Sequence, residues 1–225
     1  MAQIHLPDTS TVANLDIARL AAKDASEVAR LLEATQNPGF FYLDFRNEPT
    51  MNHVAQQARG VYTVTEEYFD QPTEVKMKDV REGQPASSDR GYKSCETDES
   101  FEMSTDEMRR GTLTFPALME EQAQLVNNFH SGCHDAAHVL LARLADALSL
   151  PLQEKHRSDQ SSESGLKLIA EPTVPLATNV LENKHRDSGT LTMLFYDRWG
   201  VQVCLSGEDE EERQQKWVFV QVAAA

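Results

Sequence analysis

The hydrophobic pattern divides the chain into a helical part and an extended part. Up to about residue 150, apolar side chains recur every three or four positions, the spacing of helices that bury one face. From Leu166 onward they form short runs of four to six residues separated by polar or glycine-containing segments, which is typical of strands. The pattern therefore predicts helices first and a β-rich region afterwards.

Three long helices are predicted in the first part. One begins at Asp24, with Asp24 or Ser26 as its cap, and ends at Asn37-Pro38-Gly39. A second is predicted from Glu48 to Phe69, with a further turn after it. The longest pattern runs from Pro116 to Leu150, where a following proline ends it.

Short runs of extended pattern are predicted as strands. Val12–Asp16 and Phe40–Leu43 fit an edge strand and a buried strand beside the first helix. Lys155–Ser164 is polar and serine-rich, which predicts a flexible link into the second part. The later strands are predicted at Leu166–Ile169, Ala177–Leu181, Thr190–Phe195, Val201–Leu205 and Trp217–Val222. Strands of this length separated by turns indicate a sandwich, jelly roll or barrel.

Composition restricts the possible partners. A chain of 225 residues accommodates one sizeable domain or two small ones. A net charge of −15 without a cluster of Lys and Arg disfavours nucleic acid and anionic membrane as partners. Three widely spaced cysteines, and neither a secretory signal nor a run of about 18 apolar residues, favour a soluble cytoplasmic protein. The oligomeric state is left open.

His185 and Asp187 are the candidate metal ligands. In an extended chain, side chains two positions apart point to the same side, so an imidazole and a carboxylate face one space. One His and one Asp are two of the three protein ligands in the facial triad of non-haem Fe(II) oxygenases. The third ligand of such a site must come from elsewhere.

The surroundings of this pair carry a family resemblance. His185-x-Asp187-x-Gly189, with the apolar run that ends at Leu194-Phe195, resembles the iron site of 2-oxoglutarate/Fe(II)-dependent dioxygenases of the isopenicillin N synthase-like family. It is most similar to fungal biosynthetic members. Gly39-Phe-Phe-Tyr-Leu43, and Arg90-Gly91-Tyr92 followed by an acidic, aromatic segment, also occur in the family's order.

The resemblance implies an α+β fold, with N-terminal helices packed on a partial double-stranded β-helix, or jelly roll. Residues 1–160 would be a mostly helical N-terminal region, and residues 161–225 an incomplete jelly-roll oxygenase domain. The implied activity is oxidation of a small-molecule substrate of secondary metabolism. Fe(II) would be the metal, 2-oxoglutarate the co-substrate and dioxygen the oxidant.

The resemblance also assigns residues. His185 and Asp187 would ligate Fe(II), and no further catalytic residue is implied. Tyr92, Leu194 and Phe195 would line the substrate side, although packing in the core explains them as well. The chain departs from the family after Asp187, where it has no His and no Arg-x-Ser. The distal His ligand and the arginine that binds 2-oxoglutarate are therefore absent from this chain.

Two other interpretations follow from the residues. An incomplete site is also compatible with a catalytically incompetent member that binds a small molecule or a partner protein. Alternatively, His130, His134 and His138, spaced by four in the longest helix, could grip a metal. Three successive turns span about 12 Å, so all three cannot meet one ion. A partly solvated polar edge of the helix is the simpler explanation.

Overall fold

The computed structural model describes residues 12–84, 88–95, 98–157, 159–170, 187, 189–196, 202–205 and 216–219. Contacts group the chain into two units, which are described separately. Unit 1 comprises Met1–Ala55, Asp135–Lys155 and Met193–Ala225, and unit 2 comprises Gln56–His134 and His156–Thr192. The division at residues 160 and 161 stays a prediction.

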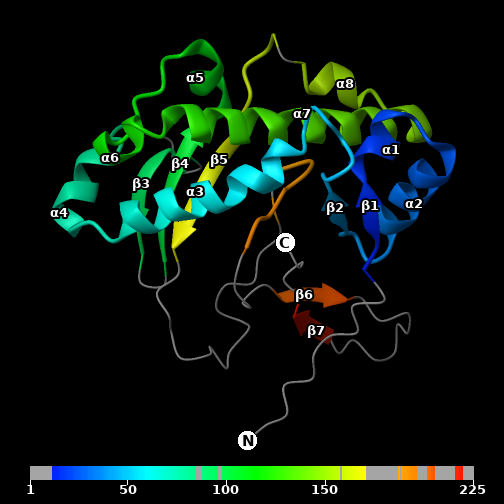
Figure 1. The fold of residues 1–225 in the computed structure, drawn as a ribbon, viewed down its shortest axis with the longest axis horizontal. Coiled ribbons are helices and arrows are strands. Elements are labelled where there is room, and N and C mark those ends of the chain that lie inside the picture. Colours follow the sequence, from blue (N-terminus) through cyan, green and yellow to red (C-terminus); the bar gives the residue numbers. More distant parts are fainter. Residues whose placement is uncertain are drawn as a thin grey trace, which may run out of the picture. The chain divides into compact units, whose positions relative to one another are not determined.

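Unit 1 begins with two strands that flank two helices (Figure 1). These elements are β1 (Asn14–Asp16), α1 (Ile17–Ala21), α2 (Ala25–Gln36) and β2 (Tyr42–Asp44). The strands pair in parallel, with Leu15 opposite Leu43. Asp24 caps α2, because its carboxylate accepts hydrogen bonds from the backbone N–H groups of Ser26 and Glu27. The predicted first helix and both of its flanking strands are confirmed, but Phe40–Leu43 is half-buried instead of buried.

The core of this part of unit 1 is apolar except for Glu27. Leu15, Ile17, Leu20 and Leu31 are buried. The Glu27 side chain is 0 % exposed, and its carboxylate accepts a 2.8 Å hydrogen bond from the Asp16 backbone N–H. A carboxylate is seldom buried unless it is paired. Glu27 therefore needs its charged partners, which are Arg19 and Arg30.

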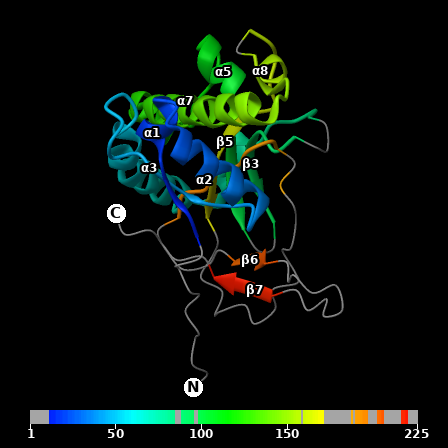
Figure 2. The same cartoon turned by 90° about the vertical axis from the view of Figure 1, so that its right-hand side faces the viewer.

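Unit 1 also contains an antiparallel pair of strands near the end of the chain (Figure 2). They are β6 (Gln202–Leu205) and β7 (Lys216–Phe219), with Val203 opposite Val218. Both overlap runs that the sequence predicts as strands. The run Ala177–Leu181 falls outside the described residues.

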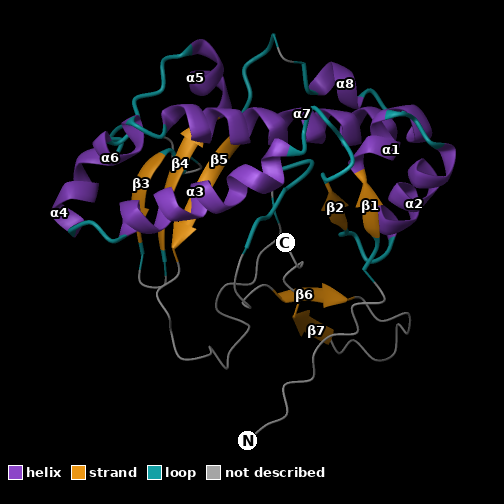
Figure 3. Cartoon of the chain, viewed as in Figure 1, coloured by secondary structure: helices purple, strands orange, loops and turns teal. Residues whose placement is uncertain are grey.

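Unit 2 contains a three-stranded antiparallel sheet made of β3 (Gly91–Ser94), β4 (Glu99–Ser104) and β5 (Gly165–Ala170), in the order β3-β4-β5 (Figure 3). Tyr92, Phe101 and Leu168 are neighbours across the strands, and all three are buried. Tyr68 of α3 packs on this face, with its ring centroid 5.2 Å from that of Phe101. The elements with residues in unit 2 are α3 (His53–Phe69), α4 (Thr73–Lys76), η2 (Met77–Asp79), β3 (Gly91–Ser94), β4 (Glu99–Ser104), α5 (Thr105–Arg110), α6 (Ala117–Glu120), α7 (Ala123–Leu148) and β5 (Gly165–Ala170).

Two predicted helices differ from those observed. The helix predicted from Glu48 begins at His53, because the Glu48 carboxylate bonds the Thr50 N–H and hydroxyl and stabilises a local turn instead. The stretch from Pro116 to Leu150 is divided into α6 and α7. The polar residues between them bury no apolar surface that would hold a continuous helix there.

The strand predicted at Thr190–Phe195 is wrong, because the structure assigns no strand to these residues. The exposure of their side chains does alternate over part of the run, but a strand also needs a hydrogen-bonded neighbour. None of the described residues pairs with this run.

The α+β composition, with helices and antiparallel sheets, is confirmed. In the described residues, no helix is long and apolar enough to cross a membrane. The remaining short helix is α8 (Leu152–Lys155).

Candidate functional site

The predicted metal ligands are described only in part. Asp187 is exposed. His185 lies outside the described residues. Within the described part of the chain, no three His, Cys, Asp or Glu side chains form a group that could hold a metal. The pairing of His185 with Asp187 therefore stays a prediction.

The segment after Asp187 contacts a histidine that sequence reasoning did not connect with it. The Nε2 atom of His156 lies 3.0 Å from the Thr190 hydroxyl, within hydrogen-bonding distance. His156 precedes Thr190 by 34 residues, and it belongs to the polar stretch predicted as a link. No pattern in the sequence indicates this contact, since it depends on how the chain folds back.

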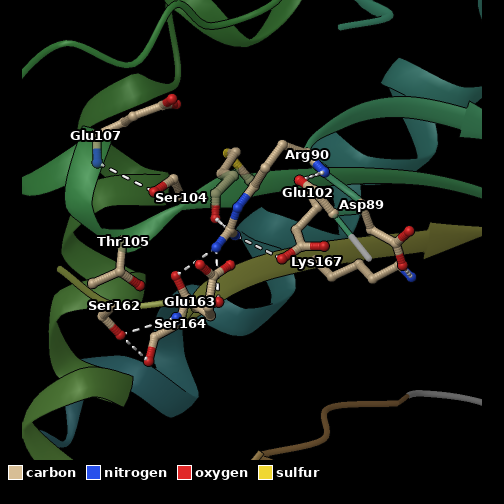
Figure 4. Close-up of polar contacts among 12 residues, drawn as sticks. Asp89, Arg90, Glu102, Ser104, Thr105, Glu107, Ser162, Glu163, Ser164 and Lys167 are labelled. Atoms are coloured by element: carbon tan, nitrogen blue, oxygen red, sulfur yellow. Dashed lines mark hydrogen bonds and ion pairs between the residues drawn. The ribbon is translucent and has the colours of Figure 1, made fainter. Parts of the chain in front are cut away.

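The end of the predicted link is tied to the sheet (Figure 4). Arg90 donates hydrogen bonds to the Glu163 carbonyl at 2.7 Å and the Ser164 carbonyl at 3.2 Å. The Ser164 carbonyl also accepts from the Thr105 N–H at 3.0 Å. The prediction of a flexible link is wrong for these residues, because polar composition does not reveal that a distant arginine binds their backbone.

Charged side chains also meet across the sheet. The Arg90 guanidinium lies 2.6 Å from a Glu102 carboxylate oxygen. Burial raises the pKa of Glu102, and the nearby Arg90 and Lys167 oppose that shift. Hydrogen bonds from Lys93 and then from Lys167 lower the pKa of Asp89. This region is thus a set of matched ion pairs, in which each carboxylate has a cation beside it.

Tyr92, predicted on the substrate side, is 1 % exposed. Its ring packs near Tyr68 at a centroid distance of 6.4 Å, and burial raises its pKa. The ammonium of buried Lys76 lies 5.7 Å from the Tyr92 ring centroid and forms an ion pair with Glu99. Tyr92 is therefore packed in the core, which is the alternative that the sequence left open.

The other two predicted wall residues belong to unit 1. Leu194 is 54 % exposed and Phe195 is half-buried. An exposed leucine is available to contact a bound molecule. The substrate-side role of all three residues stays a prediction.

His130 lies in the core instead of at a solvated edge of α7. It is 8 % exposed and shares a 2.9 Å hydrogen bond with the hydroxyl of buried Thr105. The ring of His134 stacks on it at 6.1 Å. Burial, followed by the charges of His134 and Arg109, lowers the pKa of His130 to about 4. A neutral imidazole at this position ties α7 to α5, which a helical-spacing argument does not reveal.

Acidification is expected to destabilise the fold through His130. The folded state has a pKa of about 4, whereas the ordinary value is 6.5, so the unfolded chain binds more protons between these pH values. The contribution of His130 is complete above pH 6.5 and is lost as the pH falls towards 4, by roughly 3 kcal/mol at most. Urea unfolding from about pH 4.5 to 7.5 measures this slope.

His130→Gln should flatten that pH dependence. An equally steep loss of stability in His130→Gln would assign the effect to other groups.

Comparisons with known proteins identify the family. Residues 12–109 match the family described as non-haem dioxygenase in morphine synthesis, N-terminal. The oxidoreductase vrtI of Penicillium aethiopicum is 34% identical over 203 residues, which are 84% of this chain and 48% of that protein. The 2-oxoglutarate-dependent dioxygenase frbH of Dothideomycetidae sp. (strain 11243) is 31% identical over 90% of this chain and 66% of its own. The chain belongs to the 2-oxoglutarate-dependent dioxygenase family.

This dioxygenase-family chain is shorter than its relatives. It spans about half the length of vrtI, and it spans 64% of gloE, a 2-oxoglutarate-dependent dioxygenase of Glarea lozoyensis that is 27% identical over 90% of the chain. Among solved structures, a full-length Neurospora crassa protein in complex with alpha-KG and 5-formyluracil has a TM-score of 0.50 and 17% identity. The match covers 68% of this chain and 50% of that one, and the likeness concerns the fold.

Proposed function

We propose that this chain takes part in the 2-oxoglutarate- and Fe(II)-dependent oxidation of a small-molecule substrate of secondary metabolism, with dioxygen as oxidant. The observation that carries the proposal is its similarity, over 84 to 90% of its length, to vrtI, gloE and frbH. The names of gloE and frbH describe this class of reaction for those proteins. The substrate and the type of oxidation are separate questions.

His185 and Asp187 are the residues that would hold the metal. Nitrogen and oxygen donors of this kind suit Fe(II), and Asp187 is exposed. The iron and its co-substrate would supply the oxidising power. The Asp187 carboxylate would offset part of the charge of the ion, and the neutral His185 imidazole would complete the pair.

The remaining contribution of the chain is orientation and exclusion of water. An apolar surface beside the metal holds the reacting C–H bond in place and keeps competing water away. Leu194 and Phe195 follow the ligand pair closely enough in sequence to provide part of this surface. We extend the proposal to the fold: the extended segments after Leu166 belong to a jelly roll, which the fold likeness to the Neurospora crassa structure supports.

Asp187→Ala is expected to weaken metal binding by at least tenfold, because it removes one of two protein ligands. Anaerobic titration with Fe(II) or Co(II) measures the affinity, and succinate formation from 2-oxoglutarate measures turnover. Asp146→Ala removes another exposed carboxylate, one that pairs with Arg143, and should bind metal as the unmodified chain does.

Equal metal affinity in the chain and in Asp187→Ala would contradict the assignment of the ligands. A stable oligomer that neither binds the metal nor forms succinate would instead favour the alternative of a catalytically incompetent member that binds a small molecule or a partner.

A further inference from the structure

Residues 156–164 form a linker that is contacted at both ends. The sheet contacts one end, and the segment that carries Asp187 contacts the other. Residue 158 is outside the described residues. At the C-terminal end, the backbone of Glu163 and Ser164 is held by Arg90. At the other end, His156 contacts Thr190. All of these residues belong to unit 2.

Arg90 is built into its position. Its side chain is 11 % exposed, and its guanidinium donates to four oxygen atoms. Besides the two linker carbonyls, these are the Glu102 carboxylate at 2.6 Å and the Met103 carbonyl at 3.1 Å (Figure 4). A planar group with five N–H donors satisfies such a set, and a lysine ammonium does not. The linker is therefore fixed to β4 through one side chain.

The contacts of the Arg90 side chain require a glycine at position 165. A Cβ atom on Gly165 would lie 2.0 Å from the Arg90 Nη1 atom. The start of β5 and the guanidinium thus occupy adjoining space. The Ser162 N–H adds a further anchor, since it donates to the Asp106 carboxylate at 3.1 Å.

The opposite end of the linker reaches the predicted site. The Thr190 hydroxyl that contacts His156 is three residues beyond Asp187. Three residues span at most about 10 Å of chain, so a constraint on Thr190 also restricts where the Asp187 backbone can lie. Asp187 is exposed, and an exposed side chain is not held in place by close packing.

We propose that residues 156–164 act as a brace for the Asp187 segment, with Arg90 and His156 as its positioning residues. Arg90 fixes the brace to the sheet, and His156 transmits that position to Thr190. Metal ligands need support from surrounding hydrogen bonds, because small displacements weaken coordination. The proposal rests on the proposed function, since it concerns the placement of a ligand to Fe(II).

Two variants separate the two ends of the brace. Arg90→Lys keeps the charge and loses the fork of donors, whereas Thr190→Val removes only the exposed hydroxyl. The controls are Arg46→Lys, an exposed arginine that pairs with nearby Asp44, and Thr192→Val, an exposed threonine in the same segment. Hydrogen–deuterium exchange of residues 159–164 and 189–192 is measured in metal-free protein, and Co(II) affinity is measured by titration.

Arg90→Lys is expected to speed exchange in both segments, and Thr190→Val only in residues 189–192. Both variants should weaken Co(II) binding by about two- to tenfold, the usual effect of one net hydrogen bond on an equilibrium constant. The controls should match the unmodified chain in both measurements. Should Arg90→Lys fail to fold, Thr190→Val alone decides, because its side chain is exposed.

Faster exchange in 159–164 alone, with unchanged Co(II) affinity in both variants, would overturn the brace and leave the proposed function standing. Absence of Co(II) binding in the unmodified chain would overturn the proposed function and the role in ligand placement. In that case, faster exchange of residues 189–192 in Arg90→Lys would still support a connection from Arg90 through the linker to Thr190. Unchanged exchange of these residues would reject that connection as well.

Discussion

Glu27→Ala is expected to lower the free energy of unfolding by about 2–3 kcal/mol. The Glu27 carboxylate is fully buried and lies 2.8 Å from Arg19 and 2.9 Å from Arg30, and it accepts the Asp16 N–H. Removing it leaves that N–H without its acceptor and Arg30 without its carboxylate partner, while Arg19 keeps its ion pair with Asp24. Both arginines are partly exposed, so water recovers some of the loss, which is why the expected cost is below that of a fully buried pair.

Urea unfolding followed by circular dichroism measures this effect. Glu33→Ala makes the same change on an exposed turn of α2 and should cost less than about 0.5 kcal/mol. Equal destabilisation by the two substitutions would mean that helix propensity, and not the buried ion pairs, determines the result.

Gly165→Ala is expected to destabilise the protein by about 2–4 kcal/mol. The added methyl would lie 2.0 Å from Arg90 Nη1 and 2.6 Å from the Met103 carbonyl oxygen. The side chain can move away only by giving up its hydrogen bonds, and the carbonyl only by disturbing the pairing of β4 with β5. Thermal unfolding monitored at several wavelengths measures the loss.

Gly189→Ala provides the matched control, because the nearest atom to its Cβ would be 3.6 Å away, at an ordinary contact distance. It should unfold at nearly the temperature of the unmodified chain. Unchanged stability in Gly165→Ala would show that the strand and Arg90 have more freedom than the structure gives them.

Local chemistry made much of the fold predictable. The Asp24 cap, the break at Asn37-Pro38-Gly39 and the short apolar runs identify α2, β2 and β5 because each signal acts within a few residues. Predictions failed where a distant partner decides the outcome. The polar linker is held by Arg90, more than 70 residues away, and no periodicity encodes that contact.

In the candidate site, too, local features were predictable and contacts between distant residues were not. The spacing of His185 and Asp187, together with the family resemblance of the residues around them, predicts a metal-ligand pair. Asp187 is exposed, and the pairing stays a prediction. The contact of His156 with Thr190 was not predictable, since nothing in either neighbourhood points to the other. His130 shows the limit of helical spacing, which places three histidines on one face but does not say which of them is buried.

The amino-acid sequence by itself determined the three long helices, most of the described strands, the α+β class and the family, because these depend on side-chain periodicity, capping residues and local motifs. Only the tertiary structure decided the burial of Glu27 and His130, the Arg90 anchor beside Gly165 and the contact of His156 with the Asp187 segment. Hydrogen bonds between residues far apart in the chain form only after the elements have packed, so their partners are set by three-dimensional position.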